Sequence, residues 1–151
     1  MNKLPPIQKI HEAYSAIADG RVKFDGERAE VVSSDRKKRY TVTWEGDLYT
    51  SNDNASYWQG YAGYPMIAVL MLQGRLPLDR QIAGYFKGIN WTELNARYKA
   101  KYDRAVAEVM GRLREEGVDT ERVDEEVNRV YSALKELDIS TKRSRIEVVM
   151  L

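Results

Sequence analysis

The chain contains no cysteine and a single histidine, His11, among its 151 residues. Disulfides, cysteine-based zinc sites, iron–sulfur clusters and thiolate catalysis are therefore excluded, and no pair of histidine ligands can form. The fold must be held together by a hydrophobic core rather than by covalent or metal cross-links. With 43% hydrophobic and 31% charged residues, a chain of this length can bury such a core.

Overall charge and hydropathy exclude some functions and leave others open. Lys and Arg number 24 and Asp and Glu number 23, so the net charge of +1 indicates no particular partner. No apolar run approaches the ~20 residues that a membrane span needs, so we expect no membrane partner. The first residues lack the apolar core of a signal peptide, and this favours a cytoplasmic location.

The sequence offers few groups that could carry catalysis. It has neither a phosphate-binding loop of the G-x-x-x-x-G-K type nor a dinucleotide fingerprint. His11 lies beside apolar positions of a predicted helix, where a packed or surface role is more common than a catalytic one. The triplet Asn52-Asp53-Asn54 is similar to part of a calcium loop but lacks the required glycine and glutamate. We therefore expect a protein that is not an enzyme, with no catalytic residue, no metal site and no cofactor.

The hydropathy pattern predicts an α+β fold. Helical spacing of apolar residues predicts a short N-terminal helix over residues 7–19. Alternation over residues 39–45 predicts a central strand, which weaker strands at 27–34 and 47–51 extend into a three-strand antiparallel meander. A polar, aromatic loop follows, and Pro65 suits the first position of the next helix because its missing N–H costs nothing there.

The second half of the chain is predicted to be mostly helical. After a short helix near residues 78–88, an apolar stripe from Leu94 to Leu113 predicts one helix of about six turns, with Asn90 as its N-cap. A second stripe, Val123 to Leu137, has heptad-like spacing, so the two helices would form an antiparallel hairpin. Residues 145–151 are either a terminal strand or an unpaired apolar end. The chain thus divides into an α+β finger domain, 1–88, and a helical hairpin with a basic C-terminal tail, 89–151.

Aromatic residues concentrate around the loop between the third strand and the next helix. Seven of the fifteen aromatic residues fall between positions 40 and 64. One interpretation is a packed cluster, because aromatic pairs add ~0.5–1.5 kcal/mol each beyond the area that they bury. The other is a binding surface, because rings set among Asn, Ser, Gln and Gly can stack on bases or grip a peptide.

A family resemblance rests on the layout of residues 7–74. A first helix leads into Gly20-Arg21-Val22, a hairpin carries Val31–Ser34 followed by Tyr40-Thr41-Val42, and a helix begins with Met66–Leu70. This layout resembles the zinc-finger family called SWIM. The resemblance implies an interaction module for nucleic acid or protein, because members of that family are generally regarded as such modules rather than as catalysts.

The metal ligands of that family are missing here. The aligned ligand positions hold Tyr49, Ser51, Gly63 and Pro65, and none of these is a usable zinc ligand. The resemblance therefore implies a degenerate finger without its ion. A structural zinc ion supplies ~10 kcal/mol or more toward folding, so other contacts must offset its loss. We expect aromatic packing in the loop to do this.

The leading functional hypothesis is binding of nucleic acid, or of a nucleoprotein complex, by this metal-free finger. Basic residues would contact phosphates and aromatic residues would stack on bases. The alternative is a protein-interaction or self-assembly subunit that uses the helical hairpin and the terminal strand. The residues predicted to bind nucleic acid are Arg36, Lys37, Lys38, Arg39, Tyr57, Trp58, Tyr61, Lys142, Arg143 and Arg145.

Overall fold

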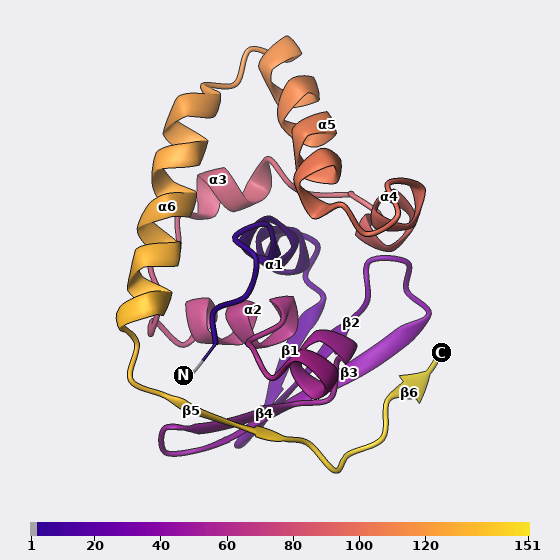
Figure 1. Ribbon diagram of the computed structural model, residues 1–151, viewed down its shortest axis with the longest axis vertical. Helices are drawn as coiled ribbons and strands as arrows, with labels where there is room; N and C mark the ends of the chain where they lie inside the picture. Colours follow the sequence, from indigo (N-terminus) through magenta and orange to yellow (C-terminus); the bar gives the residue numbers. More distant parts are fainter. Residues whose placement is uncertain (1–2) are drawn as a thin grey trace.

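The computed structural model describes residues 3–151, and its elements follow the predicted α+β order (Figure 1). The helical segments are α1 (Lys9–Ala18), a π-helical turn η1 (Ala55–Gln59), α2 (Tyr64–Leu72), α3 (Arg80–Gly84), α4 (Trp91–Arg97), α5 (Tyr102–Glu115) and α6 (Thr120–Glu136). The strands are β1 (Val22–Asp25), β2 (Arg28–Val32), β3 (Lys38–Glu45), β4 (Leu48–Ser51), β5 (Ser140–Arg143) and β6 (Val149–Met150).

All strands belong to one sheet with the order β1-β2-β3-β4-β5, and β6 pairs with β3. The predicted three-strand meander is present as β2, β3 and β4, and β1 extends it on one side. β5 lies parallel to β4, with Arg143 opposite Ser51. Neither β1 nor β5 was predicted, because most of their side chains are exposed and show no apolar alternation.

One hydrophobic core extends from the sheet through the first two helices to α5 and α6. α2 lies between α1 and the sheet (Figure 1), and its residues from Pro65 to Met71 are all buried. A helix that is hydrophobic on every side needs such surroundings. Pro65 is the second residue of α2, one place after the predicted first position but still within the first turn, and Gly63 is the N-cap.

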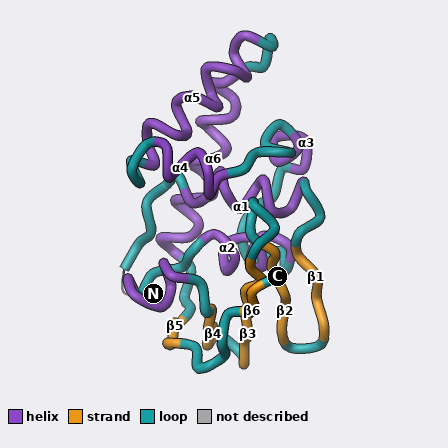
Figure 2. The backbone as a smooth tube through the Cα atoms, turned by 90° about the vertical axis from the view of Figure 1, so that its right-hand side faces the viewer, coloured by secondary structure: helices purple, strands orange, loops and turns teal. Residues whose placement is uncertain are grey.

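The helical hairpin extends away from the sheet. Figures 1 and 2 show the sheet at one end of the long axis and the α5–α6 connection at the other. α6 turns its apolar stripe inward, with Val123, Val127, Val130 and Leu134 all buried in the same core as α1. Within residues 3–151, no helix combines the length and the apolar character that crossing a membrane demands.

The single helix predicted from Leu94 to Leu113 is wrong, because the chain breaks between α4 and α5. Lys99 and Ala100 both have left-handed backbone angles, with φ of 53° and 61°. The Ala100 N–H donates to the carbonyl of Asn95 at 2.8 Å and closes the end of α4. Helical spacing of apolar side chains continues across this break, so periodicity alone could not reveal it.

Candidate nucleic-acid interface

The finger loop, residues 52–63, is anchored at its first residue to two separate parts of the chain. The buried Asn52 side chain accepts a hydrogen bond from the Thr41 N–H at 2.8 Å. Its amide nitrogen donates to the carbonyl of Ile146 at 3.2 Å. Asn52 therefore fixes the start of the loop to β3 and to the C-terminal segment at once.

The Asp53 carboxylate joins the two ends of the finger loop. One carboxylate oxygen accepts a hydrogen bond from the Ser51 hydroxyl, and the other accepts from the Ser56 N–H at 3.1 Å. Gly63 lies against the same carboxylate, since a Cβ atom at this residue would be 2.1 Å from Asp53 Oδ2. Ser51 and Gly63 are two of the positions that hold ligands in the SWIM alignment. A hydrogen-bonded carboxylate thus lies between them.

The middle of the finger loop is the π-helical turn η1, which presents aromatic rings. The Tyr57 N–H donates to the Asp53 carbonyl at 2.9 Å, and Gly60 ends the turn with φ of 73°. The rings of Tyr57 and Trp58 meet edge to face with centroids 4.7 Å apart. Trp58 is 70% exposed, whereas Tyr57 is partly buried. One large aromatic face is therefore open to solvent.

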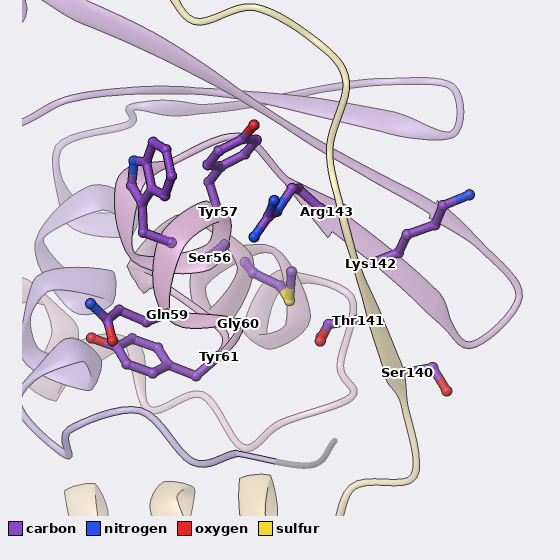
Figure 3. Close-up of a pocket in the computed structure, with 11 residues that line it drawn as sticks. Ser56, Tyr57, Gln59, Gly60, Tyr61, Ser140, Thr141, Lys142 and Arg143 are labelled. Atoms are coloured by element: carbon purple, nitrogen blue, oxygen red, sulfur yellow. The ribbon is translucent and has the colours of Figure 1, made fainter.

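β5 brings a basic side chain to this turn. The Arg143 guanidinium lies 4.7 Å from the centre of the Tyr57 ring, within range of a cation–π interaction. Figure 3 shows the two side chains next to each other, on neighbouring walls of a depression of about 430 Å³ between η1 and β5. The structure thus joins the aromatic loop to the basic tail, which are 86 residues apart between Tyr57 and Arg143.

The other predicted residues of the loop and tail are divided between surfaces. Arg145 lines a shallow depression next to Tyr57 and lies near the same surface. Lys142 extends to the opposite side of β5 from Arg143 (Figure 3), as expected for adjacent residues of a strand. Tyr61 is only 8% exposed, and its side chain extends away from β5. Tyr61 thus lines the same depression as Tyr57 and Arg143, but its ring faces away from Arg143.

The basic hairpin tip, Arg36 to Arg39, forms a separate region. Lys38 and Arg39 pair with β6, opposite Met150 and Val149. Arg39 also lies 3.7 Å from the Glu30 carboxylate. In the described part of the chain, no carboxylate lies within 4.0 Å of the charged nitrogens of Arg36, Lys37 or Lys38, nor of the three basic tail residues. These charges are available to an anionic partner.

Most of the remaining aromatic residues are structural. Tyr49 is buried, stacks with Trp44 at 6.2 Å between centroids, and donates its hydroxyl to Gln73. Tyr40 and Tyr64 meet edge to face at 6.4 Å. Burial, together with the nearby Asp53 carboxylate, raises the pKa of Tyr40 to about 12. Some aromatic residues of this region, such as Tyr49, are therefore packed in the core, whereas Trp58 is exposed on the surface.

Sequence reasoning missed the residues that shape the finger loop. The triplet Asn52-Asp53-Asn54 is similar to part of a calcium loop, but that similarity does not predict the hydrogen bonds that Asn52 and Asp53 make. A usable signal existed, because Asp53 three residues before Ser56 has the spacing of a side-chain cap on a helical turn. No local signal indicates that Gly63 must pass next to Asp53. Among residues 3–151, no three His, Asp or Glu side chains are grouped so that they could hold a metal ion.

The surfaces predicted for self-association are largely used inside the chain. The apolar stripe of α6 is buried, and β6 already pairs with β3. Exposed apolar side chains remain at the chain end, where Met150 is 69% and Leu151 is 58% exposed. A protein–protein role therefore stays a prediction, with the chain end as its remaining apolar surface.

Comparison with known proteins gives a match to a family model. The model of the family described as Uncharacterised conserved protein UCP014422 matches residues 2–140. No curated protein and no solved structure matches the chain. The family match contains the whole finger loop and ends before the basic residues of β5.

Proposed function

The chain belongs to the family of uncharacterised conserved protein UCP014422, and from its geometry we propose that it is a non-catalytic module that binds single-stranded nucleic acid. The observation that carries the proposal is the placement of Arg143 over Tyr57, beside the exposed ring of Trp58. Proteins that bind single strands combine aromatic platforms for bases with cations for the backbone. A nucleoprotein complex with exposed single strands would present the same chemistry.

A single strand fits this surface better than a duplex. Stacking on Trp58 needs the face of an unpaired base, which a duplex hides. Groove readers usually insert a helix, but the helical region here is acidic. Residues 93–138 carry nine basic and twelve acidic side chains, a net charge of −3, whereas residues 139–151 carry three basic and one acidic, a net charge of +2. The charge that attracts phosphate is therefore in the tail beside the aromatic turn.

Within this proposal, residues 7–74 act as a SWIM-like finger without an ion. The layout supports this, because Tyr49 and Ser51 lie in β4 while Gly63 and Pro65 begin α2. The Asp53 hydrogen bonds then provide the loop closure that an ion would otherwise provide. We expect no stoichiometric zinc in the purified protein and an unchanged melting temperature with a chelator. One zinc per chain by elemental analysis would contradict this interpretation.

The direct test is a salt titration of oligonucleotide binding, followed by fluorescence anisotropy. We expect labelled single-stranded DNA or RNA to bind more tightly than a duplex of the same length. Trp58→Ala should weaken binding by ~1–3 kcal/mol without changing the salt dependence, because stacking releases no counterions. Arg143→Ala and Arg145→Ala should each reduce the slope of log K against log salt by about 0.7.

Arg114→Ala provides the matched control. Arg114 is exposed at the end of α5, far from the sheet (Figure 2), and its loss changes the net charge by the same amount. This variant should leave both the affinity and the salt slope close to those of the unmodified chain. The proposal is wrong if no oligonucleotide binds at low salt, or if the Arg114 and Arg143 variants behave alike.

A further inference from the structure

A second cleft lies on the other side of the finger loop from β5. It encloses about 460 Å³ between α1, the finger loop, the start of the β2–β3 hairpin and α4. This volume is in the range of small-molecule sites. Trp58 lines both this cleft and the depression beside Arg143. A strand bound at the Arg143 surface would therefore pass the mouth of the cleft.

One wall of the cleft carries a buried pair of opposite charges. Lys9 Nζ lies 3.3 Å from Glu12 Oε2, and both side chains are 8% exposed. The Asn95 side chain of α4 lines the same cleft and favours the charged form of Glu12. A carboxylate offers about four lone-pair positions, so these two partners leave acceptor capacity on Glu12. The wall thus presents a cationic donor immediately beside two acceptor oxygens.

The pKa values of Lys9 and Glu12 indicate that a ligand with hydrogen-bond donors would stabilise the charged pair. Burial acts to lower the pKa of Lys9, but the Glu12 carboxylate together with Tyr102 and Tyr61 outweighs burial and raises that pKa. Burial also raises the pKa of Glu12, against the opposing effects of Lys9 and Asn95. The Glu12 carboxylate is therefore incompletely compensated by its protein partners. N–H groups of a ligand would supply the missing hydrogen bonds.

Aromatic rings form the other walls of the cleft. Tyr61, Tyr64 and Tyr102 line it together with Trp58. Lys9 Nζ lies 4.0 Å from the centre of the Tyr102 ring, which holds the ammonium group against this wall. Flat apolar walls around a polar edge suit a planar heteroaromatic ring.

The backbone at the mouth of the cleft is strained. Ala100 lines the cleft, and Lys99 and Ala100 are consecutive residues other than glycine in the left-handed region. Such conformations cost free energy and concentrate at binding and catalytic sites. Here they end α4 early and turn the chain so that both Asn95 and Tyr102 reach the cleft.

We propose that this cleft binds a guanine base, with Lys9 facing O6 and the Glu12 carboxylate facing the N1–H and N2–H groups. Guanine presents one acceptor followed by two donors along its Watson–Crick edge, which complements one donor beside two acceptors. Cytosine presents one donor and two acceptors, adenine begins with a donor, and uracil places an acceptor opposite the carboxylate. The inference rests on the single-strand function, since the base would come from the strand at Trp58.

Isothermal titration of the full chain with GMP, IMP and AMP tests the proposal. The three ligands share sugar and phosphate, so contacts to those groups cancel and the differences report on the base. IMP lacks only the N2 amino group, and losing one hydrogen bond to a carboxylate should weaken binding about tenfold or more. AMP should bind more weakly still. Equal affinities for GMP and IMP, or no binding of GMP at millimolar concentration, would overturn the assignment.

Two variants separate recognition of the base edge from general packing. Glu12→Gln replaces one acceptor oxygen by a donor, so the preference for GMP over IMP should fall below about threefold. Tyr102→Leu removes a ring from the wall, so all three affinities should fall together while the GMP-to-IMP ratio stays unchanged. If Glu12→Gln does not fold, the comparison of ligands on the unmodified chain still decides the outcome.

Oligonucleotides distinguish this inference from the proposed function. Single strands with one guanine or one hypoxanthine in an otherwise identical sequence should reproduce the preference seen with GMP and IMP. Equal binding of both strands, with a loss of affinity in Trp58→Ala, would overturn the guanine site and leave the single-strand function standing. A preference for GMP without any oligonucleotide binding would reject the single-strand function and identify a free nucleotide as the source of the base.

Discussion

At Gly63 the finger loop has no room for a side chain. A Cβ atom there would lie 2.1 Å from Asp53 Oδ2, and Asp53 is held by hydrogen bonds from Ser51 and Ser56. The carboxylate cannot retreat without breaking those bonds. A side chain at this position therefore conflicts with the contact that closes the loop.

Gly63→Ala should lower the free energy of unfolding by ~1–3 kcal/mol, the usual cost of overpacking a well-ordered site. Gly111→Ala is the control, because a Cβ at Gly111 in α5 meets nothing within 4 Å. That substitution should stabilise the chain by ~0.5–1 kcal/mol, since alanine is the better helix former. Urea unfolding of the two variants measures the difference, and similar values for both would show that Asp53 does not restrict residue 63.

His11 is a buried, neutral part of the core. It is 4% exposed, its ring meets Phe86 edge to face at 5.5 Å, and Nδ1 has no hydrogen-bond partner among the described residues. Burial lowers the pKa of His11 from 6.5 to about 4, although the neighbouring backbone of Gln8 opposes this shift. The side chain therefore fills space and is not available as a base within the proposed interface.

This pKa predicts how stability depends on pH. Between pH 6.5 and 4 the unfolded chain binds a proton at His11 that the folded chain does not, so stability falls as pH falls through this window. From pH 7 to pH 4.5 the contribution of His11 should be a loss of roughly 2–3 kcal/mol. Urea unfolding at both pH values should show a smaller loss for His11→Gln. An unchanged loss in that variant would contradict the buried neutral state.

Among the elements, the break between α4 and α5 has the clearest energetic consequence. Tyr98 donates its hydroxyl to Glu108 at 2.8 Å, and Arg97 lies 3.3 Å from the same carboxylate, so α4 is tied back against α5. These contacts require the chain to reverse through Lys99 and Ala100, both left-handed. The contacts between the end of α4 and α5 thus maintain a left-handed backbone conformation that alanine and lysine disfavour.

A glycine substitution within the break should therefore have the opposite effect on stability from a glycine substitution inside α5. Ala100→Gly should raise the free energy of unfolding by about 0.5–1 kcal/mol, because glycine adopts positive φ without steric cost. Ala107→Gly, at an exposed position inside α5, should lower it by about 1 kcal/mol. Thermal unfolding of both variants is the measurement. Destabilisation by Ala100→Gly would mean that residues 94–113 form the continuous helix expected from periodicity.

For the whole molecule, the sequence predicted the elements whose signals are local. The cap at Asn90 is confirmed, since its side chain accepts a hydrogen bond from the Glu93 N–H. The meander was predicted from the alternation over residues 39–45, and in the structure buried and more exposed side chains alternate along its neighbouring strands β2 and β4. β5 was not found, because its polar residues form a strand only through pairing with β4, some 90 residues earlier.

The candidate interface was predicted in pieces but not as a surface. Tyr57 and Trp58 were recognised from local composition, and Arg143 from the basic tail. Their contact depends on β5 lying parallel to β4, a long-range pairing that no local pattern indicates. For the same reason the cleft was missed, since Lys9 and Glu12 come from α1 whereas Asn95 comes from α4, more than 80 residues later in the sequence.

The position of β5 at the edge of the sheet also makes the interface dynamic. β5 is four residues long, and β4 is the only described strand with which it pairs. Short edge elements open locally at low free energy, whereas the finger loop is held by several buried hydrogen bonds. Amide hydrogens of β5 should therefore exchange faster than those of β4. Apparent affinity is proportional to the fraction of molecules in the binding-competent conformation. The fraction of time that β5 is paired with β4 would therefore determine how often Arg143 lies beside Tyr57. That fraction would in turn set the apparent affinity for a ligand at this surface.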